Sequence, residues 1–164
     1  MIVQPLSDGT IKWVPYCRGE IVCKRYSLDD WHKIVHDIDS DEDWADFLEE
    51  SFFVKCYVLK HCSNNESIAF VYVMQENYEG TIVSIHGGGW GSSSLHFRGY
   101  ILMLKHLLEK GLKVRTYCHL TNTTAIRFDR SVGFVPYRYT KDEVFMWIDE
   151  KRLKNSKIYK YFRK

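Results

Sequence analysis

The segment that most restricts the fold covers residues 82–119 and reads IVSIHGGGWGSSSLHFRGYILMLKHLLEKGLKVRTYCH. An apolar, strand-like stretch leads through a Gly/Ser cluster into a helix, and Gly111 suits the left-handed position that ends a helix before a second strand. The apolar residues of the helix recur at the spacing of a 3.6-residue period, as Phe97, Ile101, Leu104 and Leu108. A strand, a helix and a strand in this order predict a crossover between two parallel strands of one sheet.

The residues on either side of this segment predict further strands of the same sheet. Short turns separate predicted strands at residues 52–60, 67–74 and 80–86, which favours antiparallel pairing. A helix is predicted over residues 122–132, and strands follow it near residue 135 and at 143–148. Residues 8–26 predict strands with turns, and helices are predicted from the N-cap Ser27 and over 42–50. The expected fold class is α/β (α+β), with a mixed, mostly antiparallel central sheet and flanking helices.

Size and composition indicate one globular domain. The chain has 164 residues, 45% of them hydrophobic, which is enough to build a core. We expect a cytoplasmic protein, because no apolar run reaches the roughly 20 residues needed to span a membrane and the N-terminus does not read as a secretory leader. The five cysteines lack the spacing of zinc ligands, so we expect buried thiols and no metal.

Charge is unevenly placed along the chain. Residues 27–50 carry ten acidic side chains against one basic one, and residues 150–164 carry seven basic side chains against one acidic one. Both segments read most simply as solvated faces. The more specific alternatives are that the acidic segment attracts a cationic substrate and that the basic tail binds an anionic partner. The tail also contains aromatic residues, but one short tail makes a nucleic-acid partner unlikely.

Residues 122–134, NTTAIRFDRSVGF, carry the most specific motif, with Asn, then Ala three residues later, then Gly-Phe at eleven and twelve. With the preceding strand, helix and strand, this motif resembles the GCN5-related N-acetyltransferase (GNAT) superfamily. The resemblance is strongest from about residue 67 to residue 148. It implies a single GNAT-like domain over residues 1–164, with N-terminal strands in 1–26, an acyl-CoA-binding core in 81–134 and a basic tail in 150–164.

The resemblance implies an acyl-CoA-dependent N-acyltransferase that transfers an acetyl group from acetyl-CoA to an amine by direct attack. The acceptor would be a small molecule or a protein amine, and the acidic segment 27–50 would border its pocket. The resemblance is also compatible with a homodimer and involves no membrane. The alternative is a non-catalytic domain of the same fold that binds CoA or a partner protein. A nucleic-acid-associated factor is a third interpretation.

The helix after the Gly/Ser cluster is the expected seat of the CoA pyrophosphate, because a helix N-terminus presents unpaired N–H groups and the positive end of a dipole. The resemblance implies cofactor contacts from residues around this junction and from the motif: Ile85, Gly91, Ser92, Ser93, Ser94, Leu95, His96, Asn122 and Phe128. The cluster lacks the arginine and glycines that most family members have, so a plain flexible turn stays open. Asn122 also reads as a helix N-cap, and Phe128 as a core residue.

The chemistry requires a group that takes a proton from the amine and a group that protonates the leaving thiolate. His86 and His119 are candidate bases at predicted strand ends, although each also reads as a packing histidine. Many family members place a tyrosine seven residues after the motif Asn, and here that position is Asp129. Asp129 could face solvent, or be protonated in a buried site, while Tyr117, Tyr137 or water acts as the acid. We expect Asp129 to face solvent and another group to act.

Overall fold

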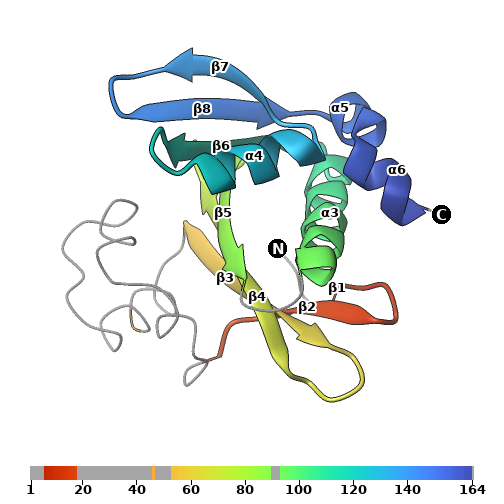
Figure 1. The fold of residues 1–164 in the computed structure, drawn as a ribbon. Helices are drawn as coiled ribbons and strands as arrows, with labels where there is room; N and C mark the ends of the chain where they lie inside the picture. Colours follow the sequence, from red (N-terminus) through yellow and green to blue (C-terminus); the bar gives the residue numbers. More distant parts are fainter. Residues whose placement is uncertain (1–5, 18–45, 47–52, 90–92, 164) are drawn as a thin grey trace.

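A computed structural model of the chain describes residues 6–17, 46, 53–89 and 93–163. The described strands form one eight-stranded sheet in the order β1-β2-β3-β4-β5-β6-β8-β7, and the described helices are α3 to α6 (Figure 1). The strands are β1 (Leu6–Ser7), β2 (Ile11–Pro15), β3 (Val54–His61), β4 (Ser67–Gln75), β5 (Ile82–Gly89), β6 (Lys113–His119), β7 (Val135–Tyr139) and β8 (Glu143–Ile148). The helices are α3 (Ser93–Glu109), α4 (Thr123–Val132), α5 (Glu150–Asn155) and α6 (Lys157–Arg163).

The pairing of the strands confirms the predicted fold class. Every pair is antiparallel except β5 with β6, which are parallel and joined by the crossover through α3. The turn before β2 and the strand itself confirm the start of the predicted N-terminal strands. The strand predicted beyond residue 17 and the helices predicted from Ser27 and over 42–50 lie outside the described residues, apart from Asp46.

The glycine run at residues 87–89 was expected in the loop, and this expectation is wrong. All three glycines belong to β5 and pair with β4, so His86 lies inside the strand and not at its end. The ladder needs only backbone groups, which glycine supplies as well as any residue. Gly89 also leaves room for a neighbour, because a Cβ there would lie 2.6 Å from Nδ1 of His96 in α3.

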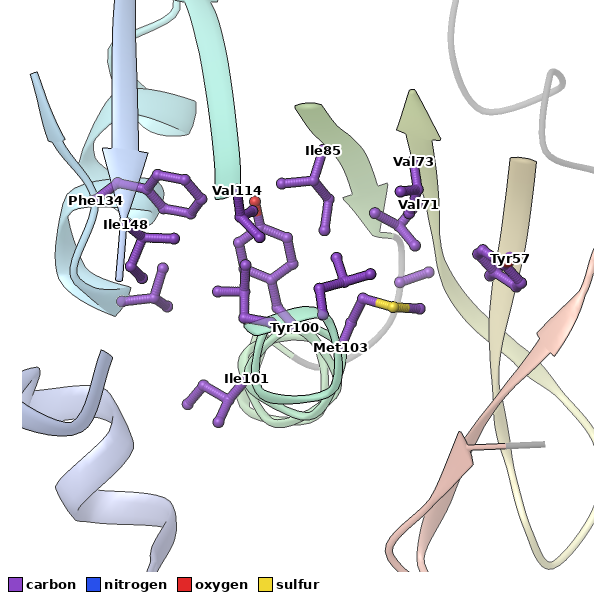
Figure 2. Packing of buried hydrophobic residues seen from close by; sticks show 14 of the residues in the cluster. Tyr57, Val71, Val73, Ile85, Tyr100, Ile101, Met103, Val114, Phe134 and Ile148 are labelled. Carbon is purple, nitrogen blue, oxygen red and sulfur yellow. The ribbon is translucent and has the colours of Figure 1, made fainter. Parts of the chain in front are cut away.

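Helix α3 packs on one face of the sheet and contributes much of the core. Its buried residues are Tyr100, Ile101, Met103, Leu104 and Leu107, so the apolar stripe is wider than predicted and Phe97 and Leu108 lie at its edges. Figure 2 shows Tyr100 and Met103 extending from α3 toward the sheet, whose residues there include Ile85 and Val114, while Ile101 points to another side of the helix. A Cβ on Gly99 would overlap the Leu59 side chain, so glycine there permits this close packing.

The basic tail forms two short helices, α5 and α6. Leu153 is buried, and Ile158, Tyr159 and Phe162 pack against the same core, whereas Tyr161 is exposed. The apolar side chains of the tail therefore hold it on the domain. In the described ranges no helix is both long enough and apolar enough to cross a membrane.

Candidate active site

The two parallel strands in the middle of the sheet pair over a short distance and then separate. Residues 82–84 of β5 pair with residues 113–115 of β6, and the pairing goes no further. At the next position the Thr116 hydroxyl donates to the Ile85 carbonyl, with an oxygen–oxygen distance of 2.8 Å. We call the space between residues 85–88 of β5 and 116–119 of β6 the fork. A strand edge that has lost its neighbour can pair with an extended ligand.

Aromatic rings hold the start of α3 next to α4. The Phe97 and Phe128 rings stack with centroids 4.1 Å apart, and the His96 ring lies 4.9 Å from that of Phe128. Of the predicted cofactor residues at this junction, Ser93 and Ser94 begin α3 and Leu95 and His96 follow, while Gly91 and Ser92 lie outside the described residues. The first turn of α3 holds no acidic residue, so nothing there opposes an anion at the helix start.

His96 does not bring a positive charge to the helix start. Burial lowers the pKa of its imidazole to about 4, so the ring is neutral near pH 7. Any attraction of this junction for phosphate therefore comes from backbone N–H groups and the helix dipole.

Helix α4 explains the sequence motif in structural terms. Asn122 is its N-cap, with Oδ1 accepting from the Ala125 N–H at 3.2 Å. Gly133 ends the helix at φ 118°, where a Cβ would lie 2.7 Å from the Arg152 carbonyl oxygen, and Phe134 after it is buried. The capping role of Asn122 is confirmed, and a role in cofactor binding remains a prediction.

Asp129 was expected to face solvent, and this expectation is wrong. Its side chain is 6% exposed and lies between α3 and β6. The Tyr100 hydroxyl donates to Oδ1 at 3.3 Å, and the Cys118 thiol donates to Oδ2 at 3.2 Å. We call Tyr100, Cys118 and Asp129 the closed cluster, because both oxygens of the carboxyl group have partners within the protein. In Figure 2, Tyr100 extends from α3 toward the sheet between Val114 of β6 and Ile85 of β5.

The closed cluster contains a carboxyl group that can hold a proton near neutral pH. Burial raises the pKa of Asp129 to about 7, against the opposing effect of the two hydrogen bonds. Burial and the Asp129 charge raise the pKa of the Cys118 thiol well above its ordinary range, so Cys118 is not an activated nucleophile. The cluster thus suits proton transfer and not covalent catalysis.

The opposite face of β5 carries two buried polar atoms without partners. Ser84 and His86 are two residues apart, so both side chains point away from α3. Ser84 is 1% exposed and His86 is 9% exposed, and within the described part of the chain neither Ser84 Oγ nor His86 Nε2 has a hydrogen-bond partner. We call them the open pair. Burial lowers the pKa of His86 to about 4, so its ring is neutral near pH 7.

The structure brings His86 together with Tyr117 but ties His119 to its own loop. The His86 and Tyr117 ring centroids lie 4.3 Å apart across the fork. Burial, followed by the charges of Glu76 and Glu143, raises the pKa of Tyr117 to about 12. His119 Nδ1 lies 2.9 Å from Thr121 Oγ1. Tyr137 is exposed on β7.

Sequence reasoning missed Ser84 and Tyr100. Ser84 could have been found from the strand period, because residue i−2 shares a face with His86. Tyr100 follows Phe97 by three residues and so belongs to the predicted helix face. No group of His, Cys, Asp and Glu in the described ranges could hold a metal ion.

Comparisons with known proteins identify the fold. No family model matches the sequence, and no curated protein matches it. Among solved structures, the chain is similar to a GNAT-family acetyltransferase from Bacillus anthracis, with TM-score 0.73, 17% identity and coverage of 90% of this chain and 99% of that one.

Two further structures agree. FdhC, described as a nucleotide-linked sugar GNAT, matches with TM-score 0.72 and 13% identity, covering 99% of this chain and 98% of its own. Spermidine N-acetyltransferase from Vibrio cholerae, in complex with CoA and spermine, matches with TM-score 0.68 and 13% identity, covering 90% of this chain and 100% of its own. The chain therefore has the fold of the GCN5-related N-acetyltransferases.

Proposed function

We propose that this chain is an acyl-CoA-dependent N-acyltransferase that transfers an acetyl group from acetyl-CoA to a primary amine. The observation that carries the proposal is the fork, where β5 and β6 stop pairing after Ser84 and Arg115. The pantetheine arm of CoA is extended and carries amide groups, so it can hydrogen-bond to an unpaired strand edge. A solved acetyltransferase of similar fold was determined with CoA and spermine, which supports CoA as the donor here.

In this proposal the CoA molecule lies across the fork, with its pyrophosphate at the start of α3. Residues 91–96 would contact the pyrophosphate through backbone N–H groups and hydroxyls. Ile85 would border the thioester end, and Asn122 and Phe128 would flank the arm from α4. Gly89 of β5 lets the His96 ring come close to the strand, and the same ring lies 4.9 Å from the Phe128 ring of α4.

The reaction forms a C–N bond and breaks a C–S bond. The neutral amine attacks the thioester carbonyl carbon, the thiolate leaves, the amine nitrogen loses one proton and the thiolate gains one. His86 Nε2, which has no hydrogen-bond partner among the described residues, would accept the proton from nitrogen and pass it to water, since burial keeps the ring a weak base. Asp129 in the closed cluster would supply the proton that the thiolate takes.

Tyr117 and His119, the other predicted catalytic residues, take supporting places in this proposal. A phenol with a pKa of about 12 is a weak acid, so Tyr117 would orient the His86 ring through their contact. His119 would be the alternative base, and a His119→Ala variant with unchanged kcat/KM would remove it from that role.

Thermal unfolding in the presence of acetyl-CoA tests the proposal. Binding to the folded state should raise the midpoint, by about 2.7 kcal/mol of stability at a hundred times the dissociation constant. ATP at equal concentration is the control, because it shares the phosphates but has no pantetheine arm. No shift at millimolar acetyl-CoA would overturn CoA binding.

A thiol-release assay with a panel of primary amines then decides between catalysis and binding. Release of CoA that depends on the amine supports the transferase. Binding without release from any amine would favour the alternative, a non-catalytic CoA-binding domain of this fold.

A further inference from the structure

The open pair points to a property of the acceptor, an inference that rests on the proposed function. Ser84 and His86 are among the most buried polar residues of the described chain, yet each leaves a hydrogen-bonding atom unpaired. A buried polar group without a partner costs free energy, typically about 1–3 kcal/mol. Groups of this kind in a folded protein call for a ligand or water as partner.

The register of β5 places the two atoms beside the fork. Ser84 lies at the last rung that pairs with β6, opposite Arg115, and His86 lies two residues further on, where the strands have separated. Residues i and i+2 of a strand are about 6.6 Å apart on the same face. A ligand that carries a hydroxyl and an amine one or two carbons apart can span this distance. It would make one hydrogen bond of about 2.9 Å to each of the two protein atoms.

The surroundings of His86 disfavour a positive charge. Burial is the sole cause that lowers the pKa of its ring to about 4, and no carboxylate in the described ranges raises it again. Glu76 and Glu143 act on Tyr117, and Arg115 lies on the same strand face as Tyr117. An ammonium group beside His86 would meet the same desolvation as the imidazolium, so the acceptor must bind there as the neutral amine.

We propose that the acceptor is a weakly basic primary amine that also carries a hydroxyl group, with Ser84 Oγ binding the hydroxyl and His86 Nε2 facing the amine. An amino sugar or an amide of a hydroxy amino acid has this chemistry. A lysine side chain or a polyamine does not, because an amine with a pKa near 10.4 is neutral in only about one molecule in a thousand near pH 7.4, against about one in four for an α-amine.

A matched pair of acceptors tests the hydroxyl. Serinamide and alaninamide are both α-amines and differ in one hydroxyl. Glucosamine, an amino sugar, and spermidine, a polyamine, are added as an expected good and an expected poor acceptor. With the wild-type protein we expect kcat/KM for serinamide to exceed that for alaninamide by about fivefold, the ordinary effect of one hydrogen bond. Spermidine should be poorer than serinamide by roughly tenfold or more near pH 7.4, because little of it is neutral.

The Ser84→Ala variant tests the residue, with Ser131→Ala on α4 as the control. Ser84→Ala should abolish the preference for serinamide, by lowering kcat/KM for serinamide to about the value for alaninamide. Its thermal midpoint should stay equal or rise, because the variant removes an unpaired hydroxyl from the interior. Ser131→Ala should keep the preference, since the Ser131 hydroxyl donates to the Phe128 carbonyl away from the open pair.

Two results would overturn the inference while leaving the transferase intact. One is acetylation of spermidine as efficient as that of serinamide near pH 7.4. The other is a Ser84→Ala variant that keeps the full preference for serinamide, which would mean that the Ser84 hydroxyl binds only water. Absence of thiol release with every amine is a different result, because it would contradict the proposed function itself.

Discussion

The closed cluster and the open pair are two groups of buried polar residues on opposite faces of the same sheet. In the closed cluster, both oxygens of Asp129 are hydrogen-bonded, by Tyr100 of α3 and Cys118 of β6. In the open pair, Ser84 Oγ and His86 Nε2 have no hydrogen-bond partner in the ranges that the structure describes. Burial shifts the pKa of Asp129 up and that of His86 down, so both groups tend toward their neutral forms.

The two groups differ in whether the folded protein supplies the hydrogen-bond partners of its own buried polar atoms. The closed cluster needs no hydrogen-bond partner from outside the protein, so we expect it to act on stability and on proton supply. The open pair is incomplete without a ligand or water, so it acts on binding. Substitutions in the closed cluster and in the open pair should therefore differ in their effects on stability and on binding.

The largest effect is expected from Asp129→Asn on stability against pH. The folded protein keeps the Asp129 proton up to a pKa of about 7, whereas the unfolded chain loses it near 3.8, so stability falls as pH rises between these values. Asn cannot ionise, so the variant should be more stable than the wild type at pH 8, by at most about 4 kcal/mol. At pH 4 this gain should be absent.

Denaturant titrations at pH 4 and pH 8 measure this difference. Asp142→Asn, at an exposed position before β8, is the matched control for the loss of one carboxyl group. An Asp129→Asn variant that loses stability at pH 8 would show that the ionised carboxylate is the stabilising form, and the closed cluster would not store a proton.

His86→Phe tests the open pair at acidic pH, where the wild type should lose stability. The unfolded chain binds a proton near pH 6.5 and the folded protein only near 4, so the wild type loses stability as pH falls through this range. The variant keeps a ring beside Tyr117 and cannot titrate, so it should resist acid better, by at most about 3 kcal/mol. Unfolding midpoints at pH 4.5 and 7.5 give the answer, with His61→Phe on β3 as the control. Equal acid loss in both proteins would refute the assignment.

Asp129→Asn should also slow the acyl transfer. Removal of a general acid lowers kcat by roughly a hundredfold, whereas the KM for acetyl-CoA should change little because the amide keeps the size of the carboxyl group. Steady-state kinetics over pH 6 to 9 check this, and the wild type should lose kcat as Asp129 ionises above about 7. A variant with wild-type kcat would assign the proton supply to water.

The smallest effect is expected from Asn122→Ala, which removes an ordinary cap hydrogen bond and sets the scale for the other substitutions. The variant should lose about 1 kcal/mol of stability at any pH, because the Ala125 N–H loses its acceptor. Thr124→Ala, exposed on α4, is the control. Acetyl-CoA titrations of both variants show whether Asn122 also binds cofactor. A loss of affinity in Asn122→Ala beyond that of Thr124→Ala would add this second role.

Local physics was enough to predict several parts of the fold. The crossover of residues 82–119 required a parallel pair of strands, and β5 and β6 form one. Gly111 and Gly133 both adopt positive φ after a helix, as the C-cap pattern predicted for Gly111. These features depend on residues close together in the sequence, so periodicity and capping rules reach them.

The remaining features depended on partners far apart in the chain. Residues 87–89 looked like a loop because glycine has no strand preference of its own, and β4 decided their structure by pairing with them. The apolar pattern of its helix predicted that Asp129 faces outward. In the structure it is buried, in contact with Tyr100 and Cys118.

The order of the elements, the parallel crossover and the cap of α4 follow from the amino-acid sequence, because they depend on short-range backbone and side-chain preferences. The point where β5 and β6 separate, the partners of the buried polar atoms and the shifts in pKa follow from the three-dimensional packing. Those properties depend on the low-dielectric interior and on register between distant strands, and neither is encoded in any single stretch of residues.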